Sequence, residues 1–246
     1  MTITLYKFGP QWGIADPSPY CVKLESYLRL AGIDYTAPEF NLSFFKMAPK
    51  GKFPFIKTDA GKIIGDSNLI IDSLIQNSGR NPDESLNAEE KAISKAFHRL
   101  LDENFYWALL YSRWIDEPGW KVVSEMFFGD VPKLIRPLIE KKQQKKIQRY
   151  LHGHGMGRHS HKEINEIARH DIQALSDYLG DKDYFFGKDQ LTFIDLCLHS
   201  YIINMIEAPI ENDLKKIILE KDNLVSHARR IQSEIYGTHE EQKLAA

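Results

Sequence analysis

The stretch Ser18-Pro-Tyr-Cys-Val-Lys-Leu-Glu-Ser-Tyr-Leu-Arg-Leu-Ala-Gly32 decides how the first part of the chain folds. Serine is a favoured helix N-cap, and proline is favoured at the first helical position because its missing N–H would have no partner there. Leu24, Leu28 and Ala31 follow at helical spacing, and the glycine after them is a typical stop. The stretch therefore predicts a helix directly behind a long loop.

Short β-like runs, each ended by turn-forming residues, lie on both sides of this helix. In chain order, we predict a strand at 3–8, the helix at 22–30, a short strand at 34–40, strands at 53–58 and 62–64, and a helix at 67–76. The sequence Asp59-Ala-Gly61 between the last two strands predicts a tight hairpin. This order of elements predicts a thioredoxin-like α/β domain over residues 1–80.

Long helices are predicted after residue 86. Three of them open with a side-chain cap followed three residues later by a carboxylate, an arrangement that satisfies free backbone N–H groups at a helix start. The three pairs are Asn87 with Glu90, Ser160 with Glu163 and Thr192 with Asp195. The polar, turn-rich segment 79–85 precedes them, so we place the domain boundary there and expect an all-helical domain over residues 86–240.

Composition excludes several classes of protein. The 246 residues carry a formal charge of −2, so we expect neither a nucleic-acid partner nor membrane association. Only two cysteines occur, Cys21 and Cys197, which excludes a disulfide-stapled scaffold and a paired-cysteine zinc site. We find no secretory-signal pattern and no apolar stretch that would span a bilayer, and we expect a cytoplasmic protein.

The start of the first helix is also suited to hold a sulfur atom. The free N–H groups and positive partial charge of a helix N-terminus stabilise a thiolate, and the Ser18 hydroxyl could donate a hydrogen bond to it. On helix statistics alone, Ser18 is more typical of an ordinary N-cap. The residues downstream decide between these interpretations.

Ser18-Pro-Tyr-Cys21 resembles the Cys-Pro-Tyr-Cys motif of glutaredoxins with the attacking cysteine replaced by serine, which is the pattern of serine-type glutathione transferases. Lys52-Phe-Pro54 is similar to the Lys-(Val/Ile/Leu)-Pro of that family, and Asp66-Ser67 is similar to its Glu/Gln-Ser pair. The segments 16–29, 50–56, 66–72 and 155–160 also resemble the failed-axon-connections group of glutathione-transferase-like proteins, relatives of the metaxins. The resemblance covers essentially the whole chain.

The resemblance implies the cytosolic glutathione transferase fold, a homodimer, and glutathione as co-substrate. In such a protein Ser18 would be the catalytic residue that activates the glutathione thiol. Pro54 would be the cis-proline of the family, and it would present the backbone of Phe53 to the cysteinyl part of glutathione.

Asp66 and Ser67 would meet the α-ammonium and the carboxylate of the γ-glutamyl group. Lys52, or Lys50 nearby, would meet the glycyl carboxylate. The function that the resemblance implies is therefore conjugation of the glutathione thiolate to an apolar electrophile.

Three alternatives remain open. Tyr6 competes with Ser18 as the hydroxyl donor, although its place within a strand favours packing. Cys21 could act as a thiol in a glutathione-dependent reductase, although a lone cysteine is more often a buried small residue. The kinship with metaxins also allows a non-enzymatic adaptor that uses the same fold for protein or membrane contacts.

The helical part would supply the acceptor pocket. Trp107, Tyr111 and Trp114 recur at helical spacing and would form an aromatic stripe for an apolar substrate, although such a stripe is more often part of a core. Four histidines fall between His152 and His161, but the glycines among them predict a flexible loop, so we expect no metal site. The basic run 141–146 is expected to be a solvated helix face.

Overall fold

The computed structural model describes residues 2–187 and 189–237. By its internal contacts the chain forms two compact units, and each is described by itself below. The first comprises the described residues of Met1–Lys95, Asp181–Ala208 and Ser226–Ala246, and the second comprises Ala96–Gly180 and Pro209–Val225. The linear division at 79–85 stays a prediction, because compactness groups later segments of the chain with the first 95 residues.

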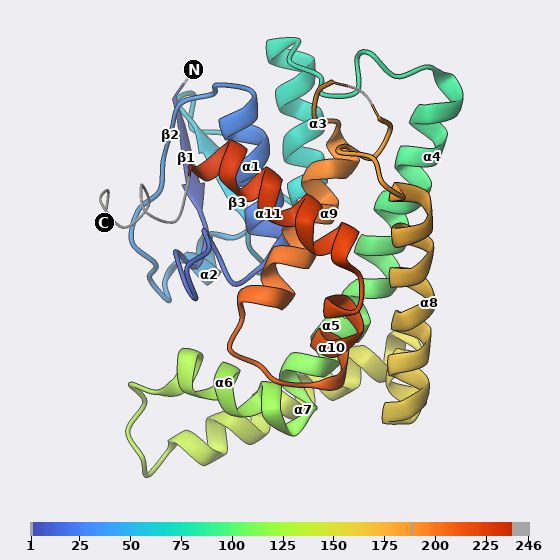
Figure 1. Ribbon diagram of the computed structural model, residues 1–246. Coiled ribbons are helices and arrows are strands. Elements are labelled where there is room, and N and C mark those ends of the chain that lie inside the picture. The colour runs from blue at the N-terminus through green and yellow to red at the C-terminus, as the bar shows by residue number, and fades with distance from the viewer. Residues whose placement is uncertain (1, 188, 238–246) are drawn as a thin grey trace. The chain divides into compact units, whose positions relative to one another are not determined.

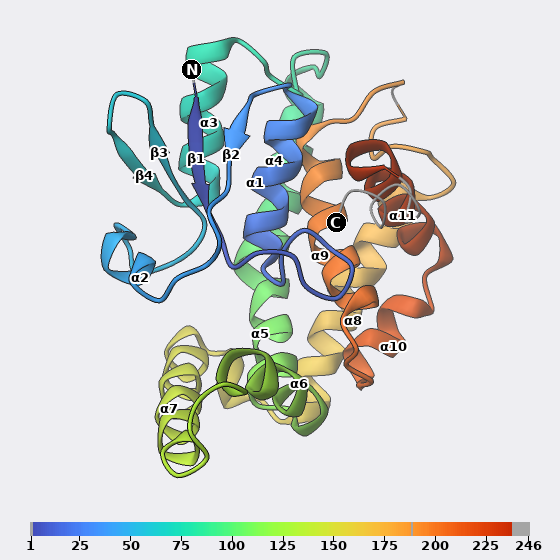
Figure 2. The same ribbon diagram turned by 90° about the vertical axis from the view of Figure 1, so that its left-hand side faces the viewer.

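The first unit contains a sheet of four strands in the order β2-β1-β3-β4 (Figure 2). The strands are β1 (Ile3–Tyr6), β2 (Tyr35–Thr36), β3 (Phe55–Thr58) and β4 (Ile63–Gly65). β2 runs parallel to β1, whereas β3 is antiparallel to both β1 and β4. The predicted hairpin is therefore confirmed, and the strands are shorter than the runs that predicted them.

Alternation along the strands separates two clusters of apolar side chains. Ile3 and Leu5 belong with Ile56 to a cluster that also contains residues of α1 (Pro19–Leu30) and α3 (Ser67–Ser78). Tyr6 and Phe55 belong to a second cluster, because successive strand residues point to opposite faces. Both predicted helices are confirmed.

A short helix that the sequence did not predict, α2 (Phe44–Met47), supplies Phe44 to the second cluster. Four residues are too few for a helical period to be visible in the sequence. Its aromatic side chain packs on the second cluster, where Phe44 contacts the ring of Tyr6 edge-on with the centroids 4.9 Å apart.

Helix α9 (Phe193–Glu207) is the buried centre of the first unit. Every residue between its two ends is buried, which is typical of a helix surrounded on all sides by protein. It packs along α1, as Figure 1 shows, and α11 (Asp222–Tyr236) contributes Ile231 to the same core.

Asp195 in the first turn of α9 joins three segments. Its Oδ2 accepts hydrogen bonds from Thr192 N at 2.8 Å and Thr192 Oγ1 at 2.6 Å. Its Oδ1 accepts from Phe185 N at 2.7 Å and lies 2.8 Å from Nε2 of His227 on α11. Since Asp195 and His227 are both buried, this carboxylate acts as the polar centre of the fold and not only as a cap.

The second unit is helical. After α4 (Ala88–Arg99), a π-helical stretch (Leu100–Phe105) leads into α5 (Tyr106–Trp114), which is followed by α6 (Glu117–Phe128), α7 (Arg136–His154), α8 (His161–Leu179) and α10 (Asp213–Leu219). Gly119 lets α6 approach α5 closely, because a Cβ there would lie 1.9 Å from Ser112 O.

The capping predictions for these helices are confirmed. Asn87 and Glu90 exchange two hydrogen bonds of 2.9 Å between side chain and backbone N–H. Ser160 N donates to Glu163 Oε2 at 2.8 Å, and Glu163 N donates to Ser160 Oγ at 3.4 Å. None of the helices in 2–187 and 189–237 is long and apolar enough to cross a bilayer.

The histidine-rich segment differs from the predicted flexible loop. His152 and His154 lie in the last turn of α7, which ends at Gly155 with φ 113°, and a short 3₁₀ helix (Met156–Arg158) leads to α8. Contacts on both sides of Gly153 hold the end of the helix, since Leu151 is buried and His154 stacks on Trp107. No group of three or more potential metal ligands occurs among the described residues.

We expect the hydrogen bonds of Asp195 to contribute more to the free energy of unfolding than the helix cap that the sequence indicates. Thr192→Ala should lower the free energy of unfolding by about 1 kcal/mol, as for other N-caps. Asp195→Ala should lower it by at least about 3 kcal/mol, because the buried N–H of Phe185 and His227 would lose their acceptor. Urea denaturation measures both. Glu163→Ala, in an exposed capping box, is the control, and an equal loss in the two carboxylate variants would contradict the prediction.

Candidate functional site

The start of α1 is organised by a buried carboxylate. Asp16 has no exposed surface, and its Oδ2 accepts hydrogen bonds from Phe8 N at 2.9 Å and Gly9 N at 3.0 Å. Its Oδ1 accepts from Ser18 N at 2.9 Å, the Asx-turn pattern in which a side chain bonds the backbone two residues on. Asp16 thereby ties the end of β1 to the N-cap of α1.

Burial raises the pKa of Asp16 to about 7, while the N–H bonds from Ser18 and Gly9 and the charge of Lys7 act against this rise. Lys7 itself is buried in an ion pair with Glu25 and donates to Ala15 O at 2.9 Å. The loop before α1 is thus held by charged groups that solvent does not reach. Sequence reasoning missed Asp16 as a site residue, although Asp-Pro-Ser is itself a turn signal.

Ser18 is the N-cap of α1, with extended backbone angles, and is half-buried. Its side chain makes no cap hydrogen bond to the helix; the Ser18 hydroxyl instead acts on the thiol of Cys21 and lowers its pKa, whereas Asp16 raises it. The Ser18 hydroxyl is therefore held near the surface of the helix start, next to a sulfur atom.

Cys21 is completely buried, and its surroundings keep the sulfur protonated. Burial raises the pKa of the Cys21 thiol well above its ordinary value, and the charge of Asp16 raises it further, whereas the Ser18 hydrogen bond lowers it. A protonated, inaccessible thiol is a poor nucleophile. This environment disfavours the reductase alternative and supports the interpretation of Cys21 as a buried small residue.

The segment before β3 adopts the predicted geometry at one point in particular, since the peptide bond between Phe53 and Pro54 is cis. Phe53 and Cys21 belong to the same buried cluster, so the structure brings this segment to the start of α1. Tyr6 belongs to it as well and stacks on Phe55, with ring centroids 4.4 Å apart and planes 3° apart. The Tyr6 ring thus has the packing role that its place in the strand predicted.

Asp66 lies between β4 and α3 in a strained backbone conformation, with φ 86°. Its Oδ1 accepts from Asn68 N at 3.1 Å and Leu69 N at 3.3 Å, and its Oδ2 pairs with Lys50 Nζ at 3.3 Å. The side chain is about two-fifths exposed, so one face of the carboxylate remains open to a ligand. Ser67, the first residue of α3, is buried.

Two lysines complete this region. Lys23 of α1 is fully buried and donates to Asn68 Oδ1 at 2.9 Å, which links the starts of α1 and α3. Lys52 is exposed. Lys23 could not be predicted as a buried residue from the sequence, because a lysine in a helix is usually exposed to solvent.

The aromatic residues of α5 each contact a neighbouring helix of the second unit. Trp107 stacks on His154 with ring centroids 4.3 Å apart, and Tyr111 lies beside His161, with 3.4 Å between Oη and Nδ1. Trp114 stacks on Phe127. All three are half-buried, so each ring packs against a neighbouring helix and still keeps part of its surface exposed.

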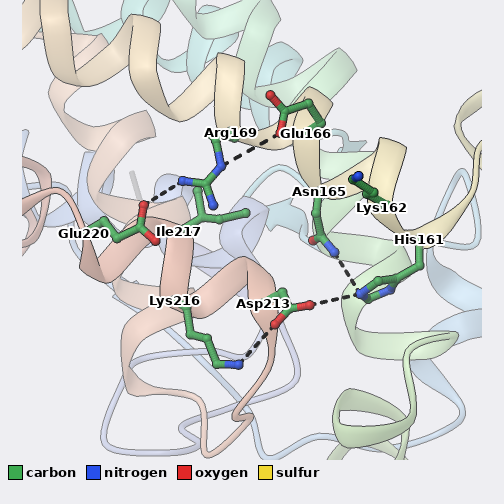
Figure 3. A pocket seen from close by; sticks show the side chains of 9 residues that line it. All are labelled: His161, Lys162, Asn165, Glu166, Arg169, Asp213, Lys216, Ile217 and Glu220. Atoms are coloured by element: carbon green, nitrogen blue, oxygen red, sulfur yellow. Dashed lines mark hydrogen bonds and ion pairs between the residues drawn. The ribbon is translucent and has the colours of Figure 1, made fainter.

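A hollow of about 280 Å³ lies between α8 and α10 (Figure 3). Its charged side chains pair with one another: Arg169 with Glu220 at 2.6 Å, Lys216 with Asp213 at 3.1 Å, and His161 with Asp213 at 3.2 Å. These pairs satisfy the groups that a ligand would need, and the hollow therefore has the character of a solvated surface.

The structure resembles solved glutathione-transferase-type proteins along its full length. The β-etherase LigF from Sphingobium sp. strain SYK-6 matches with a TM-score of 0.67 at 19% identity, covering 100% of both chains. A glutathione S-transferase from Methylobacterium radiotolerans, in complex with glutathione sulfonate, matches with a TM-score of 0.61 at 14% identity, covering 95% of this chain and 91% of that one. At these identities the likeness shows the fold, a thioredoxin-like domain followed by a helical domain.

Sequence similarity identifies the family. Models of the glutathione S-transferase N-terminal and C-terminal domains match residues 19–119 and 168–231. The chain is 34% identical to isoprene-epoxide–glutathione S-transferase of Rhodococcus sp. (strain AD45), over 94% of this chain and 98% of that protein. It therefore belongs to the glutathione S-transferase family.

Other relatives connect it to the group expected from the sequence. It is 30% identical to Failed axon connections of Drosophila melanogaster, over 97% of this chain and 59% of that longer protein. It is 26% identical to human metaxin-2, over 77% of this chain and 72% of that protein. The predicted kinship within the family is confirmed.

We expect neither cysteine to react in the native protein. Cys21 and Cys197 both have no exposed surface, so a disulfide reagent at neutral pH should label essentially none of the native protein and both thiols after unfolding in urea. Rapid labelling of one native thiol that is lost in Cys21→Ala would contradict this and revive the reductase interpretation. Cys197→Ala is the matched control.

Proposed function

We propose that the protein is a glutathione transferase that adds the glutathione thiolate to a small apolar electrophile, with an epoxide as the first class to test. The observation that carries this proposal is the 34% identity, over nearly all of both chains, to a transferase whose name specifies isoprene epoxide and glutathione. The half-buried Ser18 at the start of α1 supports it, since that hydroxyl lies where the serine-type motif requires one.

Glutathione would be held by the start of α1, by the segment around Pro54 and by the start of α3. The Phe53 backbone before Pro54 would pair in β fashion with the peptide of glutathione. The open face of Asp66 suits the α-ammonium, and the N-terminus of α3 at Ser67 suits the γ-glutamyl carboxylate. Lys52, which is exposed, would meet the glycyl carboxylate.

In the proposed reaction the Ser18 hydroxyl turns from Cys21 to the glutathione sulfur and stabilises it as a thiolate. The thiolate is the favoured partner of the hydroxyl, because a neutral thiol is a weak acceptor, whereas a hydrogen bond to an ion is roughly twice as strong as a neutral one. Lowering a thiol pKa by about 2 units requires about 2.7 kcal/mol of preferential stabilisation. One charged hydrogen bond and the N-terminus of α1 are of that order.

The bond changes follow from this arrangement. Glutathione gives up its thiol proton to solvent on binding, and the thiolate then attacks a carbon of the epoxide. A C–S bond forms, the C–O bond breaks, and the resulting alkoxide takes a proton from water. Trp107, Tyr111 and Trp114 are the proposed apolar surface for the second substrate, and a cytoplasmic homodimer remains our expectation for the active form.

Glutathione binding is tested by calorimetric titration. The wild type should bind in the micromolar to low-millimolar range (about −8 to −4 kcal/mol). Asp66→Asn should weaken this at least about tenfold, because it removes the charge that meets the ammonium. Asparagine tolerates φ 86° and can still accept the bonds that cap α3, so an unchanged melting temperature is the internal control. Equal affinity in the variant would reject Asp66 as a ligand.

Catalysis is tested at Ser18. Ser18→Ala should lower kcat/KM for glutathione with an epoxide at least about tenfold and leave the glutathione Kd nearly unchanged, because the hydroxyl acts on the sulfur and not on the tripeptide as a whole. Ser18→Thr keeps a hydroxyl and should retain more activity. Full activity in the alanine variant would transfer the role to another group, and Tyr6→Phe is the matched test.

The second candidate is a non-enzymatic member of a membrane-associated complex. The observation that favours it is a 26% identity, over 94% of this chain and 72% of that protein, to an Arabidopsis thaliana relative named as a mitochondrial outer membrane import complex protein. Absence of both heat and thermal stabilisation with millimolar glutathione would favour this candidate over the transferase.

A further inference from the structure

The end of the connection between α6 and α7, together with the first turn of α7, carries the two most exposed large apolar side chains described in the second unit. Leu134, just before α7, is 93% exposed, and Leu138 in the first turn is 73% exposed. Ile135 and Ile139, one position on from each leucine, are 47% and 37% exposed. Isolated surface leucines are common, but four neighbouring apolar residues left in water are typical of an interaction surface.

The exposed side chains continue into one face of the α7 helix. Leu138, Lys142, Lys145 and Arg149 follow one another at spacings of three or four residues within α7, so they lie in one stripe along the helix, and Leu134 lies in the turn that leads into it. The opposite face, which contains Ile147 and Leu151, is buried. Figure 1 shows α7 beside α6, and Glu140 and Ser124 join the two with a 2.5 Å hydrogen bond. The stripe is therefore the outward face of a folded hairpin.

The segment that contains the stripe is strongly basic. Residues 130–149 contain seven basic and two acidic side chains, a net charge of +5 in a chain of −2. One of the two acids, Glu140, is already paired with Arg136 at 2.7 Å, and Arg136 also pairs with Glu125 at 2.9 Å. The exposed lysines 141, 142, 145 and 146 lie beyond this network.

We propose that this face of α7, with leucines at its first turn and lysines along the rest, docks on a membrane surface rich in anionic lipid. Apolar side chains inserted at the headgroup boundary and lysines above the lipid phosphates together give stable peripheral binding, whereas either alone gives little. A second copy of the chain is a poorer occupant, because a symmetric contact would bring the two basic stripes against each other. The proposal is independent of the transferase activity.

The test is flotation of the full-length protein with vesicles of phosphatidylcholine that contain about 30% phosphatidylserine, compared with vesicles of phosphatidylcholine alone. We expect binding to the anionic vesicles only, and loss of that binding at high salt. Leu134→Gln/Leu138→Gln should lower the partition coefficient at least about fivefold. Replacing the lysines at 141, 142, 145 and 146 by glutamine should lower it at least about tenfold.

Control variants that remove the same kinds of residue elsewhere in the chain show whether the effect depends on the α7 face. Leu42→Gln removes a leucine that is 75% exposed in the first unit, and glutamine at the exposed lysines 57, 62, 91 and 95 removes the same charge elsewhere. Both should bind vesicles within about twofold of the wild type. Melting temperatures confirm that the variants fold.

Three results would overturn the proposal. One is absence of wild-type binding to anionic vesicles at low salt. Another is an equal loss of vesicle binding in the control variants, which would show that binding depends on overall composition and not on the α7 face. The third is a lipid-free oligomer that becomes a monomer in Leu134→Gln/Leu138→Gln, which would show that a second copy covers this face.

Discussion

The carboxylate of Asp16 determines how β1 ends and how α1 begins. It accepts hydrogen bonds from the backbone N–H groups of Phe8 and Gly9, which follow β1, and of Ser18, the N-cap of α1. From α9, Asn204 donates to the Asp16 carbonyl at 3.2 Å, so the same residue also fixes the buried helix against this loop. The position of the Ser18 hydroxyl depends on these contacts, since the only pairing within the described loop before α1 is a bridge between Gln11 and Ile14, several residues away from Ser18.

Buried polar groups also hold the C-terminal part of the first unit together. Asp195 bonds Thr192, Phe185 and His227, and the nearby His199 pairs with Gln232 of α11 at 2.9 Å. Burial lowers the pKa of His199 to about 4, so this histidine stays neutral in the fold. Such contacts define a unique arrangement of α9 and α11 more sharply than the apolar packing around them.

Much of the fold could be predicted from the sequence, because its signals are local. The Ser-Pro start of α1, the hairpin turn at 59–61 and the three capping pairs each concern residues within a few positions of one another. The roles of Asp16 and Lys23 could not be predicted, since they depend on burial and on partners such as Asn68, 45 residues further along the chain. Helix α7 was misjudged near His152 because glycine frequency indicates a loop only where packing does not select a helix.

Because the Ser18 hydroxyl acts on the Cys21 thiol and lowers its pKa, the resting protein already places a sulfur beside the hydroxyl that would meet the sulfur of the proposed substrate. Because the internal sulfur is neutral and the external one would be an anion, the hydroxyl can distinguish a thiolate from any uncharged group that enters the same space. A ligand with an alcohol or methyl group in place of the thiol offers no reason for the hydroxyl to leave Cys21. Selectivity for sulfur would then reside in an exchange of partners within the protein, and not in the shape of the cavity alone.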